Sequence, residues 1–111
     1  MGKLPATDSV QKLKEHLAPT LPVRERYDAV VALGSVPNAG GVPALVDALK
    51  DPDARVRRKA LETCESFAGS SRAVLGQGLA TIREVALRDQ DAGVKQAAAR
   101  LYRALTGKDP S

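Results

Sequence analysis

Apolar residues recur along the chain at intervals of three and four, with charged residues between them. This spacing predicts amphipathic α-helices, because residues three and four apart lie on one face of a helix. The first apolar stripe is Val10, Leu13 and Leu17, and Pro19 and Pro22 end the helix that carries it. The segment VRERYDAVVALG predicts a second helix, which turns back on the first and stops at its glycine. The N-terminal part of the chain is therefore expected to form an antiparallel helix pair.

Two further helix pairs are predicted after the linker SVPNAGG, whose Pro, Gly and Asn residues disfavour helix. The second pair turns at DPDA and the third pair turns at DQDAG, where Asp and Pro favour tight turns. The first helix of the third pair is expected to start near Arg72 and to end at Leu87. The stripes of the last helix in each pair are Val56, Ala60, Cys64 and Phe67, and Val94, Ala98, Leu101 and Leu105.

The segments DPDARVRRKA (51–60) and DQDAGVKQAA (89–98) repeat one arrangement: an acidic turn, a valine, a base and a helical run that ends on alanine. Three helix pairs with a period of about 33 to 38 residues predict an α-solenoid. Each pair buries its apolar face only by stacking on its neighbour, so the sequence repeats because the packing does. We expect an all-α chain of three antiparallel helix pairs. The predicted domain spans 8–107, with repeats near 8–36, 41–69 and 71–107, between a flexible tail at 1–7 and a frayed tail at 108–111.

The segments DPDARVRRKALETC and DQDAGVKQAAARLY resemble the turn and second helix of HEAT repeats, particularly the short variety named for the phycobilin-lyase proteins. The resemblance covers residues 8–107 and implies a HEAT-like or armadillo-like superhelix. It also implies that the Asp of each turn and the base six residues later form a ladder of hydrogen bonds and ion pairs between adjacent repeats. The ladder positions are Asp51 and Arg57, Asp89 and Lys95, and, in a divergent first repeat, Thr20 and Arg26.

Composition agrees with this fold. The chain is 43% hydrophobic and 27% charged, as in ordinary globular proteins, but it has no Trp and three aromatic residues. Small aliphatic side chains suit closely stacked helices, and we interpret Phe67 and Tyr102 as packing residues. A single cysteine, Cys64, excludes an intramolecular disulfide, so a reducing, cytoplasmic location is expected. The N-terminal segment MGKLPATDSV lacks the long apolar stretch of a signal peptide or membrane anchor, and no membrane partner is expected.

The chain offers no recognisable constellation for catalysis. His16 is the only histidine, and the sequence offers neither a Cys/His cluster with metal-ligand spacing nor a Ser-His-Asp arrangement. Cys64 lies on an apolar stripe, where a thiol is usually an inert small hydrophobe. Phosphate-binding loops and paired catalytic carboxylates are also missing from the sequence. We therefore expect no enzyme activity, no metal and no cofactor.

The charge pattern indicates a binding function. The net charge is +4, and the run RVRRK forms a basic cluster over Arg55–Lys59 at the start of a helix, where bases oppose the helix dipole. A cluster of this kind suits an anionic partner, although most such runs are solvated surface and Asp51 and Asp53 partly cancel this one. Arg57 and Lys95 likewise have two readings, as ligand-binding bases or as members of the ladder.

Three functions remain open. The preferred one is a non-enzymatic protein–protein interaction module, a scaffold or adaptor, whose second helices form a shallow concave face for an acidic peptide or helix. The alternative is nucleic-acid binding through the Arg55–Lys59 cluster. A further alternative is a structural subunit that self-associates through partly apolar solenoid ends. The partner-contact residues expected for the first function, which lie off the apolar stripes and outside the ladder, are Arg24, Arg58, Lys59, Gln96 and Arg100.

Overall fold

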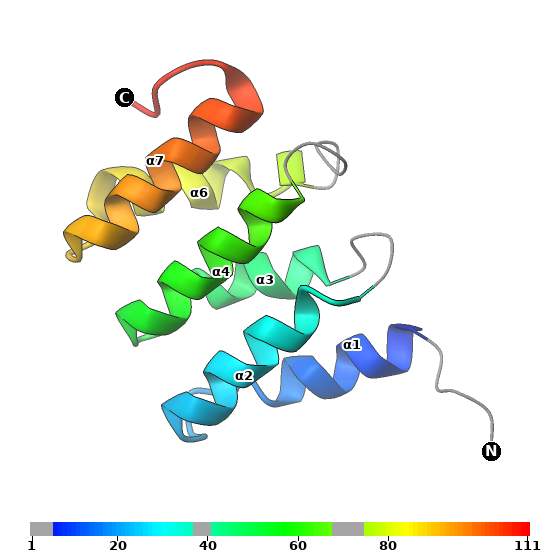
Figure 1. Ribbon diagram of the computed structural model, residues 1–111. Coiled ribbons are helices and arrows are strands. Elements are labelled where there is room, and N and C mark those ends of the chain that lie inside the picture. The colour runs from blue at the N-terminus through cyan, green and yellow to red at the C-terminus, as the bar shows by residue number, and fades with distance from the viewer. Residues whose placement is uncertain (1–5, 37–40, 68–74) are drawn as a thin grey trace.

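The computed structural model describes residues 6–36, 41–67 and 75–111 of the chain. Within these ranges the regular structure is helical (Figure 1). Residues 37–40 of the predicted linker SVPNAGG and the predicted helix start near Arg72 lie outside the described residues. The helices are α1 (Ala6–Glu15), α2 (Val23–Leu33), α3 (Val42–Ala48), α4 (Ala54–Ser66), α6 (Leu79–Arg88) and α7 (Ala92–Thr106).

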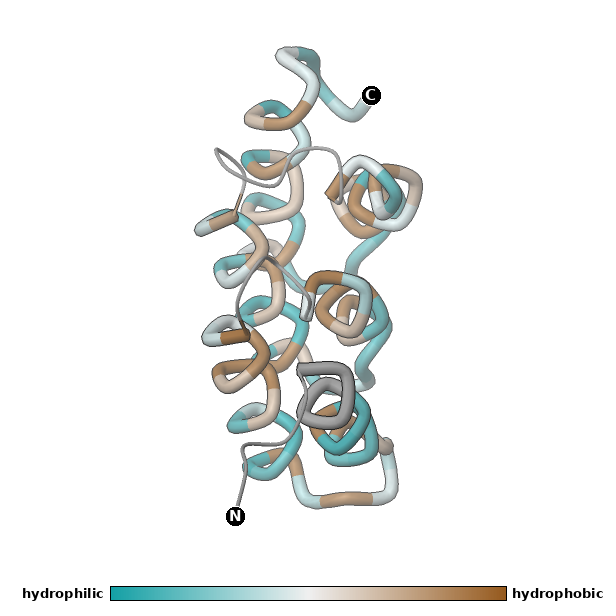
Figure 2. Tube along the Cα trace, turned by 90° about the vertical axis from the view of Figure 1, so that its right-hand side faces the viewer, coloured by the Kyte–Doolittle hydropathy of each residue, from teal (hydrophilic) through white to brown (hydrophobic). Residues whose placement is uncertain are grey.

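The helices form two layers (Figures 1 and 2). The second helices of the three pairs, α2, α4 and α7, stack side by side in one layer, which we call the second-helix layer. Helices α1, α3 and α6 form the other layer, and each is antiparallel to its partner. The molecule is elongated, 49 × 30 × 16 Å. This arrangement confirms the predicted all-α fold and α-solenoid of stacked helix pairs.

The two aspartates of each acidic turn have different structural roles. The first, Asp51 or Asp89, accepts a hydrogen bond from the backbone N–H two residues later, at 2.9 Å in both turns. This contact closes the turn before the helix begins. The second aspartate caps the following helix: Asp53 accepts from the N–H of Arg55 at 2.8 Å, and Asp91 accepts from the N–H of Val94 at 3.0 Å. The Asp-x-Asp spacing therefore fixes both the turn and the helix start.

The core lies between the two layers and consists mainly of aliphatic side chains. Cys64 is fully buried in it, and burial raises the pKa of its thiol to about 12. Phe67 and Tyr102 are partly buried and pack against this core. The largest side chains with almost no exposure are Leu33, Leu45, Leu49, Leu61, Leu75, Ile82 and Leu101.

Both ends of the domain differ from the sequence-based expectation. Helix α1 begins at Ala6, so residues 6 and 7 are helical rather than part of a tail. At the other end, Gly107 adopts a left-handed conformation with φ of 74° and turns the chain back. Pro110 is buried, and its carbonyl accepts a hydrogen bond from Arg83 Nε of α6 at 2.6 Å. The segment expected to fray is thus folded back onto the last helix pair.

Candidate functional site

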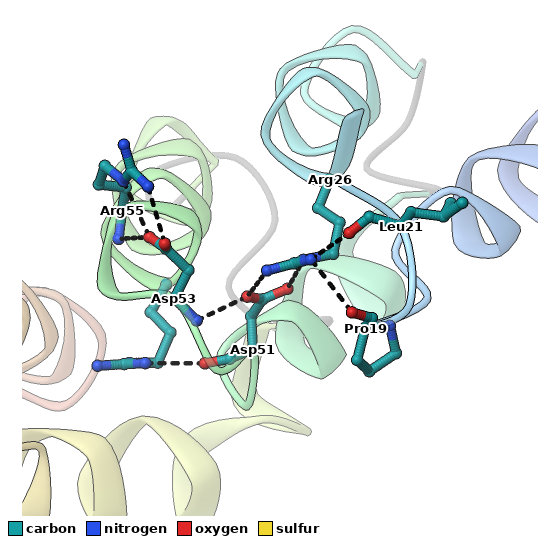
Figure 3. A network of polar contacts seen from close by, with 7 residues as sticks. Pro19, Leu21, Arg26, Asp51, Asp53 and Arg55 are labelled. Atoms are coloured by element: carbon teal, nitrogen blue, oxygen red, sulfur yellow. Dashed lines mark hydrogen bonds and ion pairs between the residues drawn. The ribbon is translucent and has the colours of Figure 1, made fainter. Parts of the chain in front are cut away.

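The first inter-repeat contact is a buried, bidentate ion pair between Arg26 of α2 and Asp51 of the second repeat (Figure 3). Arg26 Nε donates to Asp51 Oδ2 at 2.9 Å, and Nη2 donates to Oδ1 at 3.2 Å. The two side chains are only 8% and 3% exposed. The remaining nitrogen, Nη1, donates to the carbonyls of Pro19 and Leu21. The buried guanidinium is therefore satisfied by one carboxylate and two carbonyl oxygens.

The second inter-repeat contact has the same geometry one repeat further on. Arg57 of α4 donates from Nε to Asp89 Oδ2 at 2.8 Å and from Nη2 to Oδ1 at 3.1 Å. Its Nη1 also donates to the backbone carbonyl of Asp51 at 2.8 Å. Each base thus pairs with the aspartate carboxylate of the next repeat, and Arg57 contacts its own turn only through a backbone oxygen.

Thr20 and Lys95, the two outer positions of the predicted ladder, are not brought into it. Both residues are exposed, and the side chains of Thr20 and Lys95 make no hydrogen bond or ion pair within the described part of the chain. The offset between repeats explains this result. A base needs the aspartate of a following repeat, and no aspartate turn follows Lys95 in the described chain. Thr20 stands where the other two turns have aspartate, and its hydroxyl cannot form the ion pair that a carboxylate makes with a base.

A shallow groove runs between α2 and α4 in the second-helix layer, and we call it the α2/α4 groove. It consists of two adjoining hollows of about 310 and 350 Å³ that share Tyr27 and Arg55 in their linings. Four bases line the groove against one carboxylate. The lining residues are Val23, Arg24 and Tyr27 from α2, and Arg55, Arg58, Lys59 and Glu62 from α4.

The bases of the α2/α4 groove are held by carboxylates of their own helices or turns. On α2, Arg24 Nε lies 3.5 Å from Asp28 Oδ2. On α4, Arg58 Nε lies 3.4 Å from Glu62 Oε1, and Lys59 Nζ lies 3.9 Å from Glu62 Oε2. Pairs of this exposed kind contribute only about 0 to 1 kcal/mol to stability. They partly neutralise the groove without fixing its side chains.

Arg55 is held more firmly than the other groove bases. It donates from Nε and Nη2 to the carboxylate of Asp53, at 3.1 and 3.0 Å (Figure 3). The hydrogen bond from the Arg55 side chain, followed by that from its backbone N–H, lowers the pKa of Asp53 to about 2. The same contact raises the pKa of Arg55. Asp53 is thus both the cap of α4 and the partner of a groove base.

The structure divides the five predicted contact residues into two groups. Arg24, Arg58 and Lys59 line the α2/α4 groove. The other two residues, Gln96 and Arg100, lie on α7, and neither lines this groove. Arg100 Nε instead donates to Glu65 Oε2 of α4 at 3.1 Å, which joins the second and third repeats. Gln96 is exposed.

Sequence reasoning missed Tyr27 as a groove residue and assigned Arg55 only to the alternative nucleic-acid surface. The ring of Tyr27 is half-buried between the two hollows. Its position four residues after Val23 places both on one face of α2 and was the available signal. Because the register of α2 against α4 depends on the tertiary packing, the sequence could not show that this face meets the basic cluster.

A second groove between α3 and α6 has a different charge balance. Its charged lining residues are the bases Lys50 and Arg88 and the carboxylates Glu84 and Asp89. The two signs are balanced there, and Asp89 is already engaged by Arg57. Charge therefore distinguishes the α2/α4 groove as the better anion-binding surface.

Across the described ranges, no three His, Cys, Asp or Glu side chains gather in a way that could hold a metal ion. In the same part of the chain, no helix has the length and apolar character needed to cross a membrane.

The fold and the inter-repeat ion pairs define a solenoid built from helical hairpin repeats. The sequence profile of HEAT repeats matches residues 10–103, which is most of the chain. The chain belongs to the HEAT-repeat family. Its assignment to the short phycobilin-lyase variety stays a prediction. No curated protein and no solved structure matches the chain at a significant level.

Proposed function

We propose that this chain is a non-enzymatic interaction module or scaffold that presents its second-helix layer to an acidic segment of a partner protein. HEAT repeats generally mediate protein–protein interactions and are typically non-enzymatic. The observation that carries the proposal is the lining of the α2/α4 groove, where four bases surround a half-buried tyrosine. A groove of this composition favours carboxylates together with apolar or aromatic contact.

The four ladder residues are excluded from this contact surface. These are the residues of the two inter-repeat ion pairs, in which each arginine donates to an aspartate carboxylate and to backbone carbonyls: Arg26 with Asp51, and Arg57 with Asp89. A partner that competed for them would have to disrupt buried ion pairs, which is costly. The contact residues proposed here are therefore the groove bases, with Gln96 and Arg100 of α7 extending the surface toward the third repeat.

Nucleic-acid binding through the Arg55–Lys59 cluster is the competing proposal. Glu62 faces two bases of this cluster and Asp53 faces a third, so the local field is weaker than the base count suggests. A duplex or single strand bound through phosphates would show a steep loss of affinity with salt, because counterions are released on binding.

A cytoplasmic location also stays a proposal, and it depends on the single cysteine.

The test is affinity capture from a lysate of the source organism, with and without nuclease, using three proteins. The wild type is compared with the variant Arg58→Glu/Lys59→Glu and with the control Lys50→Glu/Arg88→Glu. The control makes the same change of charge at two exposed bases of the α3/α6 groove. The proposal expects a defined protein that survives nuclease, persists with the control and is lost with the groove variant. Loss of all captured material on nuclease treatment supports the nucleic-acid alternative instead.

A further inference from the structure

The ion pairs between repeats are shielded from solvent, whereas the ion pairs in the α2/α4 groove are exposed. The inter-repeat pairs are short and shielded: Arg57 Nε and Asp89 Oδ2 are 2.8 Å apart, with side chains 15% and 6% exposed. The pairs of Glu62 with Arg58 and Lys59 are 3.4 and 3.9 Å long, and the Glu62 side chain is 43% exposed. Charge-assisted hydrogen bonds between bases and carboxylates are about 2.7 to 2.9 Å long. Glu62 is therefore loosely held by both bases.

We propose that Glu62 is an internal stand-in for a carboxylate of the partner, and that an acidic peptide segment displaces it from Arg58 and Lys59 on binding. This inference rests on the proposed function and adds the chemistry of the occupant. Both bases lie in the same hollow as Glu62, beside the ring of Tyr27. A partner carboxylate that approaches this hollow meets two bases whose present partner is exposed and weakly bound.

The neighbouring hollow defines the rest of the occupant. Tyr27 borders both hollows, and Arg24 lines the one that does not contain Glu62. Arg24 is 85% exposed and its pair with Asp28 is 3.5 Å long, so this base is also free to exchange partners. Arg55 is not, because Asp53 holds it with two side-chain hydrogen bonds. The matching segment has acidic residues on both sides of an apolar or aromatic residue that contacts Tyr27.

Glu62→Gln is the decisive variant. The substitution removes the competing charge and keeps nearly the same side-chain size. Glutamine also has a helix propensity similar to that of glutamate, and the position is exposed on α4. The account predicts that it binds an acidic segment about two- to tenfold more tightly than the wild type, since two exposed pairs no longer compete. The matched control is Glu84→Gln, which makes the same charge change on α6, outside the α2/α4 groove.

The experiment is a fluorescence anisotropy titration with a labelled synthetic peptide that carries glutamates on both sides of a phenylalanine. Its glutamine counterpart and an oligothymidylate of equal charge are titrated in parallel. The expected result is tighter peptide binding by Glu62→Gln, little change for Glu84→Gln and loss of binding for Arg58→Glu/Lys59→Glu.

The remaining outcomes separate the two proposals. If the groove variant abolishes peptide binding but Glu62→Gln does not strengthen it, the stand-in role is wrong and the proposed function stands. Equal strengthening by Glu62→Gln and Glu84→Gln also overturns the stand-in role, because net charge alone then explains the gain. If the peptide binds the wild type and the groove variant equally, or only the oligothymidylate binds, the acidic occupant and the proposed function are both wrong.

Discussion

Replacing Arg26 by methionine tests the role of the buried inter-repeat ion pair. Methionine keeps much of the length of arginine but none of its charge, so Asp51 is left buried beside an apolar side chain. The Asp51 carboxylate is 3% exposed and would retain only the hydrogen bond from the N–H of Asp53. Removing one partner of a buried pair costs about 3 to 5 kcal/mol. A domain of this size is stable by about 5 to 15 kcal/mol, so the loss is a large fraction of the total.

Asp51→Asn is the graded comparison. The amide oxygen can still accept from the N–H of Asp53, and the guanidinium of Arg26 keeps the carbonyls of Pro19 and Leu21. The cost is therefore expected to be smaller, about 1.5 to 3 kcal/mol for the one charged hydrogen bond that is lost, from Arg26 Nε to the second carboxylate oxygen. Arg57→Met should also cost less than Arg26→Met, because its pair with Asp89 is more exposed.

The assay is urea unfolding followed by far-UV circular dichroism, which suits a helical chain without tryptophan. In a repeat protein, stability is close to a sum of repeat and interface contributions. Arg26→Met should therefore also separate an early transition of α1 and α2 from the unfolding of the remaining repeats. A loss below about 1 kcal/mol, the range of exposed pairs, with a single unchanged transition would refute this reasoning.

Lys95, Cys64 and Asp53 each provide a further prediction. Lys95→Met should change the free energy of unfolding by less than about 0.5 kcal/mol, because Lys95 is exposed and outside the ladder. If urea titrations find the same loss for Lys95→Met as for Arg57→Met, the pairing of each base with the aspartate of the next repeat is wrong. Cys64 should resist maleimide at neutral pH until the chain unfolds, since its pKa is raised to about 12, and rapid labelling of the native protein would contradict its burial. The raised pKa adds stability below about pH 9, which is lost as the pH rises toward 12. Asp53→Ala should lower the free energy of unfolding by about 0.5 to 2 kcal/mol, because a helix cap is lost. The pKa of Asp53 is lowered from 3.8 to about 2, so the wild type should keep this contribution above pH 3.8 and lose it as the pH falls toward 2. Equal stabilities of the two proteins at neutral pH would exclude the cap.

The helix pairs could be predicted from sequence because their signals are local. The apolar stripe from Val56 to Cys64 and the aspartates of DPDA and DQDAG act within one or two turns of helix. Cap, turn and periodicity all favour the same structure, which makes such segments predictable. The family resemblance was carried by these same segments.

The pairing within the ladder and the groove could not be read in the same way. Arg26 and Asp51 are 25 residues apart, and Arg57 and Asp89 are 32 apart, so their contacts depend on how one repeat stacks on the next. Tyr27 enters the α2/α4 groove for the same reason. The fold of the C-terminal segment depends on a hydrogen bond between Arg83 and the carbonyl of Pro110, for which the sequence has no periodic signal.

The most direct test of the central claim is a ¹H–¹⁵N NMR titration of the wild-type chain with the acidic peptide described above. The account predicts chemical-shift changes that concentrate at Arg24 and Tyr27 of α2 and at Arg58 to Glu62 of α4. It also predicts little change along α6, where Glu84 and Arg88 lie. Changes that concentrate on α6, or that spread evenly over all exposed bases, would contradict the assignment of the α2/α4 groove as the contact surface.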